Sequence, residues 1–330
     1  LVDPRIRIAA RGSITRAGRV VIDHLAVDAP AALVSAKGTG EDWGAESASV
    51  VGTLDIPDLS RLHALTHQSL TGEGGVAFSA DWNGSGADVR ASAEFAQLST
   101  NVATADILLG TSPKLRLAAS FGVDGRVDVE QLILSGKEIA MTASGAFGPE
   151  APGIDWRAQL PDLAAVDPSL EGALEAMGRL TGTPDEPAAT VRFTLTEAAV
   201  AGYPVSAGQL DAVIKGLATQ PAADVTLEAQ IAGLPARATA ELLFEGPGAI
   251  RIDPLELQLA SLVAEGAATL KSTGAAVGEI SASIGNLADL ATFIGKPLTG
   301  AVDADLSLSE SGGRQMAEVS VSAVGAGLPG

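Results

Sequence analysis

Apolar and polar residues alternate along most of this chain. Leu115 and Leu117, for example, alternate with Lys114 and Arg116. The same period of two recurs in three further segments: 191–195, 225–231 and 255–259. Successive side chains of a β-strand lie on opposite faces, so this period predicts strands with one apolar and one solvated face. Such one-sided burial is typical of antiparallel sheets.

The alternation also predicts which residues share a face. We expect one concave face to carry the apolar residues that are the candidates for ligand contact: Val127, Val129, Val191, Phe193, Leu195, Val225, Leu227, Leu255, Leu257, Val302, Leu306 and Leu308. The opposite face should carry the charged residues that lie between them: Arg126, Asp128, Arg192, Glu228, Glu256 and Asp303.

A pattern of glycine and leucine occurs three times along the chain. The segments 14–25, 121–132 and 244–255 align without gaps, each with an apolar residue, a glycine four positions later and a leucine seven after that. The glycines are Gly18, Gly125 and Gly248, and the leucines are Leu25, Leu132 and Leu255. A glycine turn between alternating segments predicts a hairpin at each site.

A second pattern follows each of those leucines in the same order. Asp58, Asp162 and Asn286 each precede a short apolar pattern, as helix N-caps do. We therefore predict short helices near 58–67, 162–167 and 286–294. Each is followed by a leucine, any residue and a glycine, where a new strand should begin: Leu70-Thr71-Gly72, Leu170-Glu171-Gly172 and Leu298-Thr299-Gly300.

The two patterns together indicate a long internal repeat. Leu25, Leu132 and Leu255 are separated by 107 and 123 residues, which suggests approximate units 14–120, 121–243 and 244–330 within one continuous segment spanning 1–330. The repeat also decides an ambiguous region. Residues 172–180 have partly helical spacing, but the equivalent stretch after Gly300 alternates strictly, so we predict a strand in both.

These elements predict an all-β chain: a long, repetitive, antiparallel sheet with a few short helices. We expect more than about 45% strand and less than about 15% helix, well outside ordinary proportions. Three short helices cannot cover so many strands. The apolar face must therefore curl on itself, meet a second sheet or hold a ligand.

Composition narrows the class of partner. Apolar residues make up 46% of the chain but aromatic residues only 3%, so burial must come from small and aliphatic side chains. The net charge of −19, with no basic stripe along the sequence, makes nucleic acid an unsuitable partner. Without cysteine there are no disulfides and no thiolate metal sites. We also expect no signal peptide here, and any membrane anchor to lie outside this segment of a longer chain.

No arrangement of residues typical of catalysis or cofactor binding is found. His63 and His67 share the spacing of one helical face, but zinc needs a third protein ligand and none is suitably spaced. The phosphate-binding loop and the nucleophile elbow are both absent. We therefore predict no catalytic residue, no cofactor and no metal, and a protein that is not an enzyme.

Two other architectures agree with the alternation. One is a closed β-sandwich or β-helix whose core is filled by its own side chains. The other is a secreted β-solenoid of the adhesin type. Solenoid coils repeat every 20–30 residues or so, whereas the period here exceeds 100 residues and includes a helix.

The repeated patterns resemble those of the AsmA-like family. The resemblance rests on the Asp-Leu or Asn-Leu helix starts at 58, 162 and 286, the following Leu-x-Gly, and the glycine hairpins that lead to the three leucines. It implies a taco-like, U-shaped sheet with an apolar interior, located in the periplasm of Gram-negative bacteria. It further implies transport of phospholipid, whose acyl chains would occupy the groove, in outer-membrane biogenesis. An Omp85-type outer-membrane protein is the implied partner, through regions outside this segment.

Overall fold

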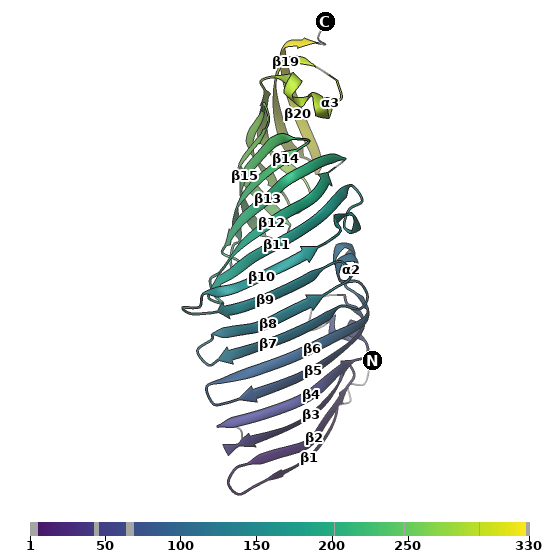
Figure 1. Cartoon of the computed structure of the whole chain (residues 1–330), viewed down its shortest axis with the longest axis vertical. Helices are drawn as coiled ribbons and strands as arrows, with labels where there is room; N and C mark the ends of the chain where they lie inside the picture. The colour runs from purple at the N-terminus through teal and green to yellow at the C-terminus, as the bar shows by residue number, and fades with distance from the viewer. Residues whose placement is uncertain are drawn as a thin grey trace. The chain divides into compact units, whose positions relative to one another are not determined.

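Strands make up 70% of the residues and helices 7%, which confirms the predicted all-β class. The computed structural model (Figure 1) describes residues 6–42, 46–63, 69–200, 202–246, 248–296 and 298–327. The chain divides into two units, residues 1–168 and 169–330. Each unit contains ten strands and is described by itself below.

The elements of unit 1 are, in order, β1 (Arg7–Ile14), β2 (Val20–Ala29), β3 (Ala32–Glu41), β4 (Ser47–Ile56), η2 (Leu59–Leu62), β5 (Thr71–Trp82), β6 (Gly86–Ser99), α2 (Ala103–Leu109), β7 (Lys114–Gly122), β8 (Val127–Ser135), β9 (Ala140–Phe147), β10 (Gly153–Leu160) and η3 (Leu163–Ala165).

The elements of unit 2 are, in order, β11 (Leu170–Gly182), β12 (Pro187–Val200), β13 (Tyr203–Lys215), β14 (Ala222–Ile231), β15 (Leu234–Gly246), β16 (Ala249–Leu259), β17 (Leu262–Leu270), β18 (Ala276–Ile284), η4 (Leu287–Leu290), α3 (Ala291–Ile294), β19 (Thr299–Ser311) and β20 (Arg314–Gly327).

Within each unit the strands form an antiparallel meander, because each strand pairs with the one that precedes it and the one that follows it in the chain. Unit 2 follows the same rule from β11 to β20. Among the described residues β1 pairs only with β2 and β20 only with β19. The predicted antiparallel sheet is therefore present, and it is not closed.

The three predicted short helices are present, each as a 3-10 turn. The side chains of Asp58, Asp162 and Asn286 each accept a hydrogen bond from the backbone N–H two residues later, which is the capping geometry that the sequence indicated. The last turn continues into α3, so the third helix matches 286–294 closely. The expected extension of the first helix to 67, with His67, lies outside the described residues.

The sequence analysis missed one helix, α2. No side chain caps its start at Val102, which explains why no signal was visible there. The carboxylate of Asp106 instead accepts hydrogen bonds from the Thr100 backbone N–H and from the hydroxyls of Ser99 and Thr100, at 2.5 to 2.7 Å. These bonds lower the pKa of Asp106, the backbone contact contributing most, and they attach the helix to the end of β6.

The residue before each repeated leucine belongs to a β-bulge, a second feature that the sequence analysis missed. The three predicted glycine turns have left-handed backbones, with φ of 81° at Gly18, 83° at Gly125 and 77° at Gly248. In the strand that follows, the register shifts just before the leucine, between Ile22 and Leu25 and at the two equivalent positions. The bulge adds one residue and so returns each leucine to the apolar face.

The repeated Leu-x-Gly marks another set of bulges. Gly172 has a φ of 98°, and its equivalents Gly72 and Gly300 have 109° and 103°. A Cβ atom at Gly172 would lie 2.6 Å from the backbone oxygen of Glu197 on the neighbouring strand. Glycine is required at these positions both for the left-handed backbone and for the close approach of two strands.

We predict that Gly172→Ala destabilises the protein more than Gly233→Ala. Both residues have positive φ, at 98° and 81°, but a Cβ atom at Gly233 would meet nothing within 4 Å. The Gly233 variant should therefore lose only about 1–2 kcal/mol, the cost of a left-handed backbone. Urea unfolding monitored by circular dichroism measures the difference. Equal midpoints for the two variants would contradict the close approach of β11 and β12.

Candidate functional site

The pairing register places the predicted ligand-contact residues on one face in each unit. In unit 2, Phe193 is opposite Leu210, which in turn is opposite Leu227. The same row continues through Ala238 to Leu257. Val191, Leu195, Val225, Leu255, Val302, Leu306 and Leu308 occupy neighbouring rows of this face. In unit 1, Val127 is opposite Phe121 and Val129 is opposite Ala119.

The predicted charged residues lie on the other face. Arg192 is opposite Asp211, with its Nε 2.6 Å from the carboxylate oxygen. Glu228 faces Arg237, at 3.0 Å. Glu256 and Asp303 occupy rows of the same polar face, and Asp128 lies on the polar face of unit 1, where Arg126 pairs with it. The facing pattern expected from the alternation is therefore present in each unit.

The apolar face carries almost no charge. We define it by the rows in register with Leu117 and Leu132 in unit 1 and with Phe193 and Leu257 in unit 2. In unit 1 the described members of these rows are apolar residues and glycines only. In unit 2 the apolar face is likewise free of charged side chains until Glu310, which lies at the end of β19, two residues beyond Leu308. A shift of one residue in the register of a strand would have placed its charged side chains on the apolar face.

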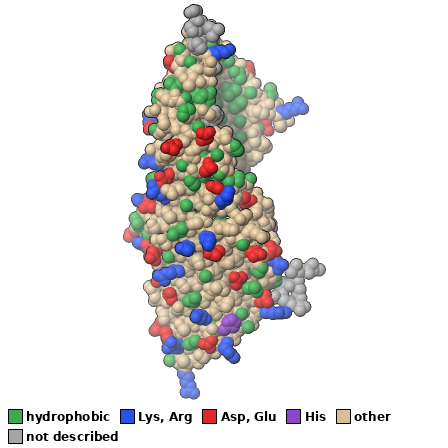
Figure 2. Space-filling view, turned by 45° about the vertical axis from the view of Figure 1, so that its right-hand side comes forward, with side chains coloured by type: hydrophobic (Ala, Val, Ile, Leu, Met, Phe, Trp, Pro, Cys, Tyr) green, Lys and Arg blue, Asp and Glu red, His purple; other side chains and the backbone are tan. Residues whose placement is uncertain are grey.

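The apolar face is partly exposed. Leu195, Leu257 and Leu306 are all intermediate in exposure, and among the described residues only Pro113 is less than 2% exposed. The total accessible surface is 19567 Å², against about 12,500 Å² expected for a compact monomer of this mass. Figure 2 shows charged side chains spread over the outer surface, and a recess lined by hydrophobic side chains in the part nearest the C-terminus.

The large buried side chains concentrate at the short helices, whereas the buried alanines lie within strands. Ten of the 17 buried hydrophobic residues among those described are alanines. Apart from Val205, the larger buried residues lie in a 3-10 turn or at the end of the strand before it: Ile56 and Leu59, Leu160 and Leu163, and Leu287 and Leu290. The large buried side chains of each unit thus lie mainly at one end of the strands, at the turns, and the buried residues along the strands are mainly alanines such as Ala176, Ala212 and Ala264.

Small residues shape the lining of this face. Gly208 lies opposite Leu195, and a Cβ atom at Gly208 would be 3.1 Å from that leucine side chain. Likewise a Cβ atom at Gly52 would be 2.8 Å from the ring of Phe78. Large side chains therefore lie over glycine or alanine neighbours, which gives a shallow, aliphatic surface without projecting obstacles.

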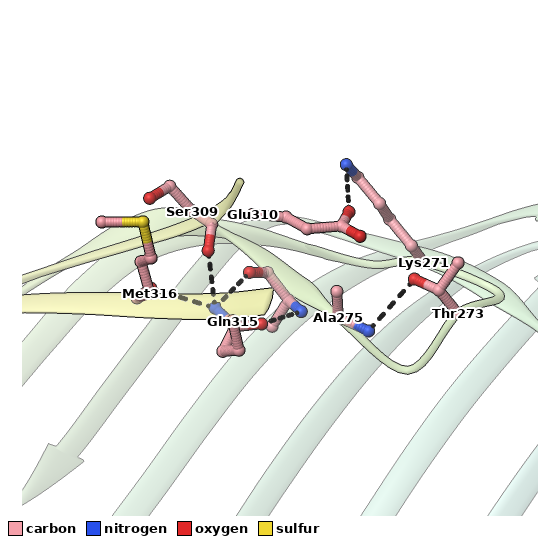
Figure 3. Close-up of polar contacts among 8 residues, drawn as sticks. Lys271, Thr273, Ala275, Ser309, Glu310, Gln315 and Met316 are labelled. Carbon is pink, nitrogen blue, oxygen red and sulfur yellow. Dashed lines mark hydrogen bonds and ion pairs between the residues drawn. The ribbon is translucent and has the colours of Figure 1, made fainter. Parts of the chain in front are cut away.

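A polar network ends the apolar face at the β19–β20 hairpin (Figure 3). The side-chain amide of Gln315 donates to the Ala276 carbonyl at 2.8 Å and accepts from the Ala276 N–H at 2.7 Å. In this way the amide bonds to both backbone groups of Ala276, which no residue of a further strand pairs with. Beside it, Lys271 Nζ lies 2.9 Å from the Glu310 carboxylate. The network separates the apolar rows from the solvated hairpin tips.

The described residues form no group of three or more His, Asp and Glu side chains able to hold a metal ion. The shifted carboxyl pKa values are all lowered, as at Asp211, where the hydrogen bond from Arg192 is the main cause. A general acid would need the opposite shift. Within the described ranges, no helix is both long and apolar enough to span a bilayer.

Comparisons with known proteins add no family: no family model, no curated protein and no solved structure matches this chain.

We predict that Leu257→Ala costs much less stability than Leu290→Ala. Leu290, the last residue of η4, is 7% exposed, and truncating such a buried leucine typically costs about 2–5 kcal/mol. Leu257 is half-buried on the open face and should lose about 1 kcal/mol of transfer free energy. The two unfolding midpoints provide the comparison. Similar large losses in both variants would indicate a filled interior instead.

Proposed function

We propose that this segment is a lipid-transfer scaffold of the AsmA-like type, whose apolar face carries phospholipid acyl chains between the two membranes of a Gram-negative envelope. Within that family the repeat patterns are most similar to those of TamB, the inner-membrane translocation and assembly module protein. The observation that carries the proposal is the long, uncharged, half-exposed apolar face in each unit. A soluble protein normally covers such a surface, so a large uncovered one indicates a ligand or partner.

The dimensions of the face suit an acyl chain. Ten strands at about 4.8 Å spacing extend for about 43 Å, and half of a bilayer core is only about 15 Å thick. One unit therefore offers room for more than one chain length along its face. The lining contacts are aliphatic and nonspecific, as a chain of methylene groups requires.

The energetics favour loose binding. Full burial of one methylene group is worth about 0.8 kcal/mol, so a half-covered chain of about 16 carbons gains roughly 6 kcal/mol. Association costs of about 4 kcal/mol or more offset most of that gain. Weak, position-independent binding is what a transfer path needs, because a lipid must be able to move from one row to the next.

The polar face supports a periplasmic setting. Its charges, together with the net charge of −19, keep the sheet soluble although half of its surface is apolar. We propose that a segment outside this sequence anchors the protein in the inner membrane. An Omp85-type outer-membrane protein would bind other regions of the whole protein.

The antiparallel pairing bears on the solenoid alternative. Parallel β-helices stack equivalent strands of successive coils in parallel, whereas every strand pair described within the two units is antiparallel. A filled sandwich would in addition need a second sheet against the apolar face. Among the described residues, the strands of each unit form a single meander without a second sheet.

We predict that Leu195→Arg and Leu257→Arg leave the protein folded but abolish its crosslinking to phospholipid. Each change places a guanidinium on the apolar face, where it can reach solvent from an open groove while obstructing acyl chains. Thr239→Arg is the matched control, because it adds the same charge on the polar face opposite Glu256. The measurements are photo-crosslinking to phospholipid and circular dichroism.

The outcome separates the open groove from a closed core. A charge buried without a partner in a dry core would unfold the segment. Loss of the β-sheet signal in both leucine variants, with Thr239→Arg unaffected, would therefore reject the lipid groove. Native mass spectrometry of the unmodified protein should in parallel detect co-purified phospholipid.

A further inference from the structure

Three basic side chains with no ion-pair partner cross the polar face of unit 1. Lys37 on β3, Arg90 on β6 and Arg116 on β7 are exposed, and within the described residues none makes an ion pair. We call these three residues the cationic row. They are far apart in the sequence, which is why no basic stripe is visible there. Strand pairing brings the three residues together, so the polar face of unit 1 has a short basic stripe that the sequence alone does not show.

The cationic row is unusual in this acidic chain. Several bases elsewhere on the sheet pair with acids, as Lys114 does with Glu94 at 3.0 Å and Arg192 with Asp211 at 2.6 Å. Arg90 is opposite Ala118, two residues from Arg116, so the two guanidinium groups start from diagonally adjacent positions about 7–8 Å apart. Glu94 lies diagonal to Arg116 but is already engaged by Lys114.

The row lies in a hollow of about 900 Å³ on the polar face. Cavities of roughly 300–1,000 Å³ are typical of ligand sites. Hydroxyl groups line the hollow between the cations, among them those of Ser35, Ser79 and Ser92. Guanidinium, ammonium and hydroxyl groups all donate hydrogen bonds to carboxylate oxygens. Carboxylates line only the two ends of the hollow, at Asp23 on β2 and Glu130 on β8.

We propose that this hollow binds an extended acidic segment of a partner protein. From β3 to β7 the row spans four strand spacings, about 19 Å, which matches about six residues of extended chain. A linear, flexible anion can follow the row along the hollow. The row supplies the positive charge, and the partner supplies carboxylates to the part of the hollow between Asp23 and Glu130.

This docking surface is distinct from the apolar groove. It lies on the opposite face of the sheet, since Lys37 and Arg116 alternate with the apolar residues Ala36 and Leu117. The scaffold could therefore hold a protein partner and a lipid at the same time. The proposal does not depend on lipid binding.

The test measures binding of fluorescein-labelled decaglutamate by fluorescence anisotropy at 20 and 150 mM NaCl. The unmodified protein should bind the peptide, and more tightly at low salt, because the Debye length shortens from about 20 to 8 Å over this range. The triple variant Lys37→Thr, Arg90→Thr and Arg116→Thr should lose at least about tenfold in affinity. Threonine suits an exposed strand, so circular dichroism should be unchanged.

The matched control removes three bases that are paired with acids on the polar face of unit 2: Arg192→Thr, Lys215→Thr and Arg237→Thr. It changes the net charge equally and should bind decaglutamate within about twofold of the unmodified protein. An equal loss in both variants would assign the effect to net charge and overturn the site. So would full retention of binding in the triple variant of the row.

Vesicles separate a protein partner from a membrane. The same variants are tested by co-sedimentation with vesicles of phosphatidylglycerol and phosphatidylcholine. The proposal expects no dependence of sedimentation on the cationic row. Sedimentation that requires the row, without binding of decaglutamate, would replace the acidic peptide by an anionic membrane surface.

Discussion

The structure depends on the two-residue period of side chains along an antiparallel ladder. Each strand can keep its apolar residues on one face only if its register with both neighbours is correct, and an error of one residue inverts the whole strand. Across ten successive strands in a unit, the rows that contain Phe193 and Leu257 remain free of charge. Regular alternation alone does not achieve this, because several strands contain an extra residue.

Where an extra residue interrupts the two-residue alternation, a β-bulge returns the following apolar residue to the apolar face. Ile22 and Leu25 are three positions apart, yet both lie on the apolar face because Asp23 and His24 share one bulged position. The same device precedes Leu132 and Leu255. Its recurrence suggests that the bulge also bends each repeat in the same way, since bulges increase local twist. The repeated pattern is thus a pattern of curvature as much as of pairing.

Pairing between strands and the packing at the short helices are the two contacts that hold each unit together. Interior strands bond to a neighbour on both sides, and the large buried side chains gather under η2, η3 and η4, where leucines such as Leu163 and Leu287 pack. Along the middle of the apolar face, the larger side chains such as Leu195 and Leu257 are partly exposed. The polar face of unit 2 meanwhile pairs bases with acids across strands, as in Arg192 with Asp211 and Arg237 with Glu228. The cationic row is an exception and stands out for that reason.

The sequence by itself determined the strand content, the capped turns at Asp58, Asp162 and Asn286, the glycine hairpins and the face to which each candidate residue belongs. These features are local: period, cap and turn chemistry act over a few residues, and the repeat corrected the one misleading helical pattern near Leu174. Only the tertiary structure decided that the sheet does not close, that α2 forms through the bonds of Asp106, and that Lys37, Arg90 and Arg116 lie in one hollow. Those features arise between strands distant in sequence, and the pairing that brings them together leaves no mark in any single segment.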